Sequence, residues 1–397
     1  MKCVKKLTMI ALSVVFCVFL MGAPVMAKNM KKIEGPGKAK NIIFMVPDGQ
    51  GLSNVTAARI FKNGPDGPLL FQETLENIGY QRTHSANSTV TDSAAAASAW
   101  AVGEKFINGE VSCHSDGEGG CNDLKPTILE LAAQMGKATG LVASSQISHA
   151  TPASFGAHVP NRGQGFEIAR QYIEEVGIDV VLGGGVYHAD EEQRQYIIDS
   201  AIAKGYTFAQ NETQMDSAAG AGAKVLGLFE QNGIGKGKTP EMFWVDGSGY
   251  PEGEPTLAEM TWAALDILEN DKDGLFLVVE GSQIDWANHA WDISFQIAES
   301  LAFDASVKVV LEWLNAKADR KNDTLVIIVA DHDCAGFGIN GPYGTLSDIG
   351  DTVEGSFTSG GHTAVDTIIY SQGPGSEKLN AAVDNTDLYY VMEEVLR

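Results

Sequence analysis

Side chains that bind metal ions follow four short apolar segments of this chain. Each segment has the length of a buried β-strand. In open α/β sheets the carboxyl ends of the strands form the edge at which ligands bind, so we expect these side chains to lie close together. Carboxylates and imidazoles bind zinc and harder divalent ions, and their number predicts one site with several metal ions. The segments and the residues after them are 41–46 with Asp48, 140–145 with His149 and Thr151, 274–279 with Glu280, and 324–330 with Asp331 and His332.

Asp285 and His289 are four residues apart in the segment that follows Glu280. In a helix this spacing places both side chains on one face, where they can bind the same metal ion. The alternative is an ordinary surface pair in i,i+4 contact. The buried strand that precedes the pair favours the metal site, because that strand brings Asp285 to the carboxyl edge of the sheet.

A run of alanines begins directly after Asp92 and Ser93 and ends at Trp100. Alanine favours helix, so Asp92 and Ser93 stand at the start of a predicted helix. Taken alone, the pattern is that of an ordinary N-cap. The functional interpretation is a nucleophilic serine at a helix N-terminus, where free N–H groups and the helix dipole favour a bound anion such as phosphate.

The segments between these strands have helical periodicity. Helices that alternate with buried strands predict an α/β fold. Two stretches, 216–255 and 339–361, are rich in glycine and weakly periodic, so we expect peripheral insertions or loops there. His362 follows the second stretch and gains importance only from the other candidate ligands. The helices are expected over 128–134, 165–176, 256–270 and 293–316.

The bulk composition limits the partners of the chain. Its 397 residues, 44% of them hydrophobic, suffice for one large α/β domain with insertions or for two domains. The formal net charge of −23 argues against nucleic acid or an anionic membrane as a binding partner. The same charge repels an anionic substrate, so such a substrate requires local positive charge, which bound metal ions supply.

The N-terminal residues 1–27 have the layout of a secretory signal peptide. Lysines precede an apolar run over 7–21, which is short for a membrane-spanning helix. We therefore expect export to the periplasm or the medium, no membrane attachment after cleavage, and a catalytic domain over 28–397. In an oxidising compartment, Cys113 and Cys121 form either a disulfide or a metal pair, and Cys334 is left unpaired.

Six segments together resemble the alkaline phosphatase family. They occur in the order found in the family and span nearly all of the chain after residue 27. The resemblance implies a three-layer α/β fold, with a central mostly parallel sheet, helices on both faces and small peripheral insertions. The segments are 48–51, 91–95, 150–162, 280–285, 330–332 and 361–363.

The resemblance also implies roles for individual residues. Ser93 would be the nucleophile that forms a phosphoserine, and Arg162 would hold two phosphate oxygens. The implied enzyme is an exported alkaline phosphatase (EC 3.1.3.1) that hydrolyses many small phosphate monoesters, as a monomer or as a homodimer. It would use two zinc ions and a third ion, usually magnesium. The ligands would be Asp285, His289 and His362 for one zinc, Asp48, Asp331 and His332 for the other, and Asp48, Thr151 and Glu280 for the third ion.

Two positions depart from the pattern of the enteric bacterial members. His149 stands in place of an aspartate, and Trp286 stands in place of a lysine. Magnesium remains the expected third ion, but an imidazole also suits zinc or cobalt, and His149 would bind the ion directly or through water. Without the lysine, we expect phosphate to be held less tightly and released faster.

Two other functions compete with this hypothesis. Phosphodiesterases and sulfatases of the same superfamily usually carry a threonine or a modified cysteine as nucleophile and lack counterparts of Thr151 and Glu280. Ser93 together with Arg162 therefore favours monoesters. A protein that only stores metal or binds phosphate is a different class, and the presence of Ser93 beside a complete ligand set argues against it.

Overall fold

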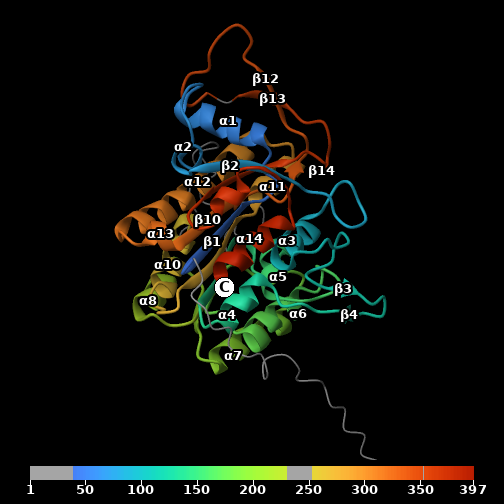
Figure 1. Cartoon of the computed structure of the whole chain (residues 1–397), viewed down its shortest axis with the longest axis vertical. Helices are drawn as coiled ribbons and strands as arrows, with labels where there is room; N and C mark the ends of the chain where they lie inside the picture. Colours follow the sequence, from blue (N-terminus) through green and yellow to red (C-terminus); the bar gives the residue numbers. More distant parts are fainter. Residues whose placement is uncertain (1–38, 230–252, 352) are drawn as a thin grey trace, which may run out of the picture. The chain divides into compact units, whose positions relative to one another are not determined.

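The computed structural model describes residues 39–229, 253–351 and 353–397 (Figure 1). The predicted signal peptide lies outside these ranges, as does most of the second half of the stretch 216–255. Within the described ranges, no helix is long and apolar enough to cross a membrane.

A ten-stranded sheet forms the centre of the described chain. Its four central strands, β10-β1-β9-β5, correspond to the four apolar segments, and all of them are mutually parallel. Only β15 runs against its neighbours β10 and β2, so the sheet is mostly parallel, as predicted. In sheet order the strands are β16 (Ala382–Asp384), β2 (Asn77–Arg82), β15 (Thr367–Gln372), β10 (Thr324–Val329), β1 (Asn41–Pro47), β9 (Leu275–Gly281), β5 (Ala138–Gln146), β6 (Val180–Gly184), β8 (Val225–Leu228) and β7 (Thr207–Ala209).

Helices cover both faces of the sheet, because the central strands are apolar on both faces. In β1, Phe44 packs into one core and Met45 into the other, as alternation along a strand requires. The three-layer α/β architecture is thus confirmed. One face carries α3 (Ser93–Val102), α4 (Ile128–Gln134), α5 (Ala150–Gly156), α6 (Gly165–Gln171), α7 (Glu191–Ala203) and α14 (Asp387–Leu396), and the other carries α1 (Leu52–Asn63), α2 (Leu70–Thr74), α8 (Glu212–Ala221), α10 (Leu257–Leu268) and α12 (Ile293–Ala316).

The predicted helices form close to their expected bounds. Thr127 caps α4 and Thr256 caps α10, each through a reciprocal pair of hydrogen bonds with the glutamate three residues later. The helix expected over 165–176 is α6 continued by a π-helical turn, Tyr172–Val176, which ends at Gly177.

The prediction of a peripheral insertion over 216–255 is wrong for its first part. Its first residues complete α8, and β8 pairs with β6 and β7 in the central sheet. This part therefore belongs to the main fold and is no peripheral insertion. The apolar run Val225–Leu228 is fully buried but too short to stand out among the glycines around it. The second stretch, 339–361, contains the separate two-stranded sheet of β12 (Gly338–Gly341) and β13 (Glu354–Ser356).

Candidate active site

The carboxyl ends of the central strands carry the candidate ligands. Asp48 follows β1 and is fully buried. The turn after it depends on Gly49, whose φ is +69° and whose missing Cβ would lie 2.8 Å from Asp285. Gly49 N–H donates to Asp331 Oδ1 at 3.1 Å. A glycine is needed at this turn because it allows three carboxylate-bearing segments to approach one another.

Asp285, His289 and His362 form a first ligand group. Asp285 and His289 lie on α11 (Gln283–His289), and His362 lies on β14 (His362–Thr363). The Nε2 atoms of the two histidines are 3.1 Å apart. The Asp285 carboxylate lies 3.4 Å from His289 Nε2 and 3.5 Å from His362 Nε2. Three donor atoms at this separation fit the coordination shell of one divalent ion.

Backbone carbonyls orient both imidazoles of this first group. His289 Nδ1 donates to Gly360 O at 2.9 Å, and His362 Nδ1 donates to Thr91 O at 2.9 Å. Each bond places the proton on Nδ1 and leaves the Nε2 lone pair free to face the other donors. Metal-binding histidines in proteins are commonly oriented by this kind of bond.

Asp48, Asp331 and His332 form a second group beside Ser93. His332 Nε2 lies 3.0 Å from Asp331 Oδ2, 3.6 Å from Asp48 Oδ1 and 3.2 Å from Ser93 Oγ. All four residues are buried. Burial by itself would lower the pKa of His332, but the charge and hydrogen bond of Asp331, together with the charge of Asp285, raise the pKa overall.

Asp48, Thr151, Glu280 and His149 surround a third position. Oxygen or nitrogen donors of Asp48, His149 and Glu280 lie within 4.8 Å of one another. Among the described residues, the Thr151 hydroxyl and both carboxylate oxygens of Asp48 and Glu280 are buried without a hydrogen-bond partner. Buried polar groups are rarely left unpaired, so these orphaned oxygens fit a bound hard cation.

The pKa values show the cost of this arrangement without a cation. Burial, and then the charges of Asp331 and Asp285, raise the pKa of Asp48 well above its ordinary range. Burial and the charge of Asp331 raise the pKa of Glu280 to about 7. A nearby cation would reverse both shifts, because it favours the ionised carboxylates.

Ser93 is the first residue of α3, and Asp92 is the N-cap of this helix. Asp92 Oδ1 accepts a hydrogen bond from Ala95 N–H at 3.0 Å, while Arg162 Nη1 donates to Asp92 Oδ2 at 2.9 Å. Asp92 therefore caps the helix and also binds Arg162, and Ser93 is not needed as the cap. Arg162 lies beside the same helix start and presents a cation there.

His149 lies between Arg162 and aromatic side chains. Its Nε2 accepts from Arg162 Nη2 at 3.3 Å, and its ring meets the rings of Trp286 and Tyr187 edge-on at 5.8 and 5.4 Å. Burial, followed by the charge of Arg162, lowers the pKa of His149 to about 3. The imidazole is therefore kept in its neutral form, which is the form that binds metal ions.

Some contributors to the site have no signal in the sequence. The carbonyls of Thr91 and Gly360 orient two histidines, yet any residue type supplies a carbonyl. Asp92 is recognisable as a cap but not as the partner of Arg162. Cys334 is a buried free thiol that lies near the first ligand group, with Sγ 3.7 Å from Asp285 O.

The fold and these ligand groups define an α/β protein with a candidate multi-metal centre beside a serine at the start of a helix. The sequence profile of the alkaline phosphatases matches residues 39–348. Alkaline phosphatase 3 of Bacillus subtilis is 32% identical over 97% of this chain and 95% of that protein. Streptomycin-6-phosphate phosphatase of Streptomyces griseus is 33% identical over 91% of this chain and 92% of that protein. The chain belongs to the alkaline phosphatase family.

Solved structures agree with this assignment. Alkaline phosphatase from the Antarctic bacterium TAB5 superposes with a TM-score of 0.72 at 28% identity. The match covers 91% of this chain and 99% of the other. The enzyme of a psychrophilic Shewanella superposes with a TM-score of 0.75 at 28% identity. Membership of this family identifies the chain as an enzyme and supports hydrolysis of phosphate monoesters.

Proposed function

We propose that this enzyme hydrolyses phosphate monoesters through a phosphoserine at Ser93, with Arg162 holding two oxygens of the phosphate. The observation that carries the proposal is the convergence of three ligand groups with Ser93, whose Oγ lies 3.2 Å from His332 Nε2. Arg162 suits this role because its planar guanidinium matches two phosphate oxygens at once.

The three groups of donors suit three metal ions. Asp285, His289 and His362 would hold one zinc ion, and Asp48, Asp331 and His332 would hold a second. Thr151 and Glu280, with Asp48 and His149, would hold the third ion. Magnesium is the proposed third ion, with zinc or cobalt as alternatives. When bound, the metal ions supply the positive charge that this acidic protein needs to hold a phosphate and to stabilise the entering and leaving oxygens.

The residues of the chain perform two successive displacements. Ser93 Oγ forms a bond to phosphorus and gives up its proton, while the bond from phosphorus to the alcohol oxygen breaks and the alcohol leaves after taking up a proton. Water then forms a bond to the same phosphorus, the bond from phosphorus to Ser93 Oγ breaks, and the serine oxygen takes up a proton as phosphate leaves. Arg162 keeps the phosphate in one orientation through both displacements, so that each nucleophile meets phosphorus opposite its leaving group.

The first test compares substrates. We expect the metal-loaded enzyme to hydrolyse p-nitrophenyl phosphate far faster than bis-p-nitrophenyl phosphate or p-nitrophenyl sulfate. Preference for the diester or the sulfate would instead assign the enzyme to the phosphodiesterases or sulfatases of the superfamily. The Streptomyces relative is named as a phosphatase of streptomycin 6-phosphate, which supports phosphate monoesters as the substrate class here.

The proposed location is the periplasm or the medium. Two observations support it: the signal-peptide pattern over 1–27, and the disulfide between Cys113 and Cys121, since disulfides persist in oxidising compartments. N-terminal sequencing of the protein recovered from outside the cytoplasm tests this, and the mature chain is expected to begin at Lys28.

A further inference from the structure

Residues 107–115, which we call the brace, connect to the segment that carries Arg162. Gly109 O accepts a hydrogen bond from Arg162 N–H at 2.8 Å. Two residues further along, Val111 and Val159 exchange both backbone hydrogen bonds, each at 3.1 Å. The main chain of Arg162 is therefore positioned by the brace.

The brace is also bonded to the helix of Ser93. Ser112 N–H donates to Ser98 Oγ at 2.8 Å, and Ser98 Oγ lies 3.1 Å from Ser154 Oγ. The Ser154 hydroxyl reaches Ala94 O at 3.1 Å and Ala150 O at 3.0 Å. This chain of hydroxyls thus ends one residue after the nucleophile Ser93 and one residue before Thr151.

The three serines are completely or almost completely buried, with 0 to 2% of each exposed. Ser98 interrupts a helix whose other residues from 94 to 102 are alanine, tryptophan and valine, and the helix itself gains nothing from a hydroxyl there. Ser112 Oγ adds a second bond, at 2.6 Å to Ser154 O. Buried hydrogen bonds of this kind hold their partners at fixed distances, because breaking one leaves an unpaired polar group.

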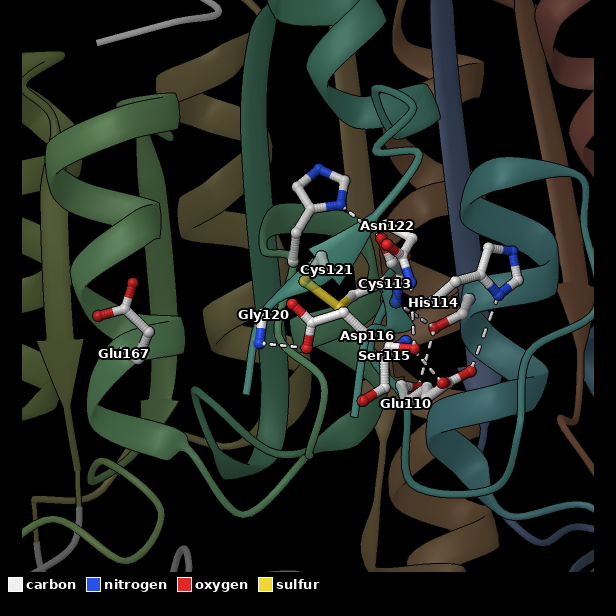
Figure 2. Close-up of a disulfide and its surroundings, with 12 residues drawn as sticks. Glu110, Cys113, His114, Ser115, Asp116, Gly120, Cys121, Asn122 and Glu167 are labelled. Carbon is white, nitrogen blue, oxygen red and sulfur yellow. Dashed lines mark hydrogen bonds and ion pairs between the residues drawn. A yellow bond between two sulfur atoms is a disulfide. The ribbon is translucent and has the colours of Figure 1, made fainter. Parts of the chain in front are cut away.

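The brace is held rigid by its own contacts (Figure 2). The disulfide Cys113–Cys121 begins directly after Ser112. The buried carboxylate of Glu110 accepts hydrogen bonds from Ile107 N–H and Ser115 N–H, both at 2.8 Å. A bound phosphate must meet Ser93 and Arg162 simultaneously, and misplacement of either by about 1 Å weakens the reaction strongly.

We propose that Ser98, Ser112 and Ser154, together with the disulfide-closed brace, are positioning residues that fix the distance between Ser93 and Arg162. The inference rests on the phosphomonoesterase function proposed above. None of the three serines belongs to the candidate ligand groups, so we expect them to affect phosphate only through the placement of Ser93 and Arg162.

A double-mutant cycle tests this on the metal-loaded enzyme. The inhibition constant of inorganic phosphate and KM for p-nitrophenyl phosphate are measured for Ser98→Ala and Ser154→Ala, in the wild-type and in the Arg162→Ala background. Loss of one buried hydrogen bond is expected to raise both constants about three- to tenfold in the wild-type background. In the Arg162→Ala background the same substitutions should change them less than about twofold, because coupled residues are not additive.

Ser306→Ala is the matched control. Ser306 is also fully buried and donates within its helix to Phe303 O at 2.7 Å, but it contacts neither the brace nor the site, so both constants should stay unchanged. Ser112→Ala and the pair Cys113→Ser with Cys121→Ser repeat the test should Ser98→Ala fold poorly. Equal effects in both backgrounds would overturn the proposal. A wild-type enzyme that binds phosphate but does not hydrolyse monoesters would overturn the proposed function. In that case the double-mutant cycle, measured on the inhibition constant of phosphate alone, would still test the brace.

Discussion

Asp92 and Arg162 are joined across 70 residues of sequence by a hydrogen bond of 2.9 Å, and the other oxygen of the same carboxylate caps the helix that begins at Ser93. One side chain therefore sets the start of the nucleophile helix and restrains the guanidinium beside it. Although burial alone would lower the pKa of Arg162, the charge and hydrogen bond of Asp92 raise it, so the cation is retained in a half-buried position.

Asp92→Asn separates the two roles of this carboxylate. Asparagine caps helices as well as aspartate does, so the unfolding temperature should change little. The hydrogen bond to Arg162 loses its charge, and we expect the phosphate inhibition constant to rise about three- to tenfold. Asp92→Ala is the comparison variant, which should show the same change and in addition lose about 1 kcal/mol of stability. Unchanged phosphate inhibition in both variants would show that Asp92 does not restrain Arg162 in solution.

Ser93→Ala tests the nucleophile. The hydroxyl is removed without disturbing the packing of the alanine-rich helix α3, so metal content and unfolding temperature should match the wild type. We expect kcat to fall by a factor on the order of a thousand or more. Rapid-quench experiments with labelled substrate should recover a phosphoserine from the wild type and none from the variant. Wild-type kcat in the variant would rule out Ser93 as the nucleophile.

His149→Asp tests the third ion position. A neutral imidazole is a poorer ligand for magnesium than a carboxylate, so the variant should bind magnesium more tightly and be activated more by added magnesium. In the Antarctic enzyme, variants with a histidine replaced by glutamate or aspartate were solved with magnesium in the site called M3. His188→Asp places the same charge on a neighbouring exposed position and should leave magnesium activation unchanged. Equal magnesium dependence in wild type and His149→Asp would argue against a role for His149 at this ion.

Removal of the metal ions should make stability depend on pH. In the metal-free protein, the pKa of Glu280 is about 7, against an ordinary value of 4.5, and that of Asp48 is raised as well. Between pH 4.5 and about pH 7, the folded state binds more protons than the unfolded state, so the stability of the folded state falls as pH rises. Bound ions hold the carboxylates ionised and remove this loss. The gap in unfolding temperature between loaded and metal-free protein should therefore widen from about pH 5 to pH 8.

Glu280→Gln provides the check on this assignment. Its metal-free form has one fewer raised carboxyl pKa, so its unfolding temperature should fall less steeply over the same pH range. Parallel curves for loaded and metal-free wild type would contradict the burial of unpaired carboxylates in the metal-free protein.

Much of the fold can be predicted from local patterns in the sequence. The central strands are buried on both faces, so each is a continuous apolar run, and the residues after the runs must meet at one edge of a parallel sheet. The i,i+4 spacing of Asp285 and His289 likewise predicts a shared face, and α11 provides it. Strand β8 was not predicted because its four residues, one of them Gly227, carry too little periodicity to identify a strand.

Distances between side chains that are far apart in the sequence cannot be predicted from such local patterns. The sequence left Cys113 and Cys121 open between a disulfide and a metal pair, and the structure resolves this as a disulfide. Similarly, nothing near Arg162 indicates its bond to Asp92, and nothing near Ser98 indicates Ser112 and Ser154. Burial and periodicity act over a few neighbouring residues, whereas the spacing of side chains tens of residues apart is the outcome of how whole helices and loops pack. For that reason the residue types of the candidate site could be recognised in the chain, but their mutual geometry follows from the packed fold.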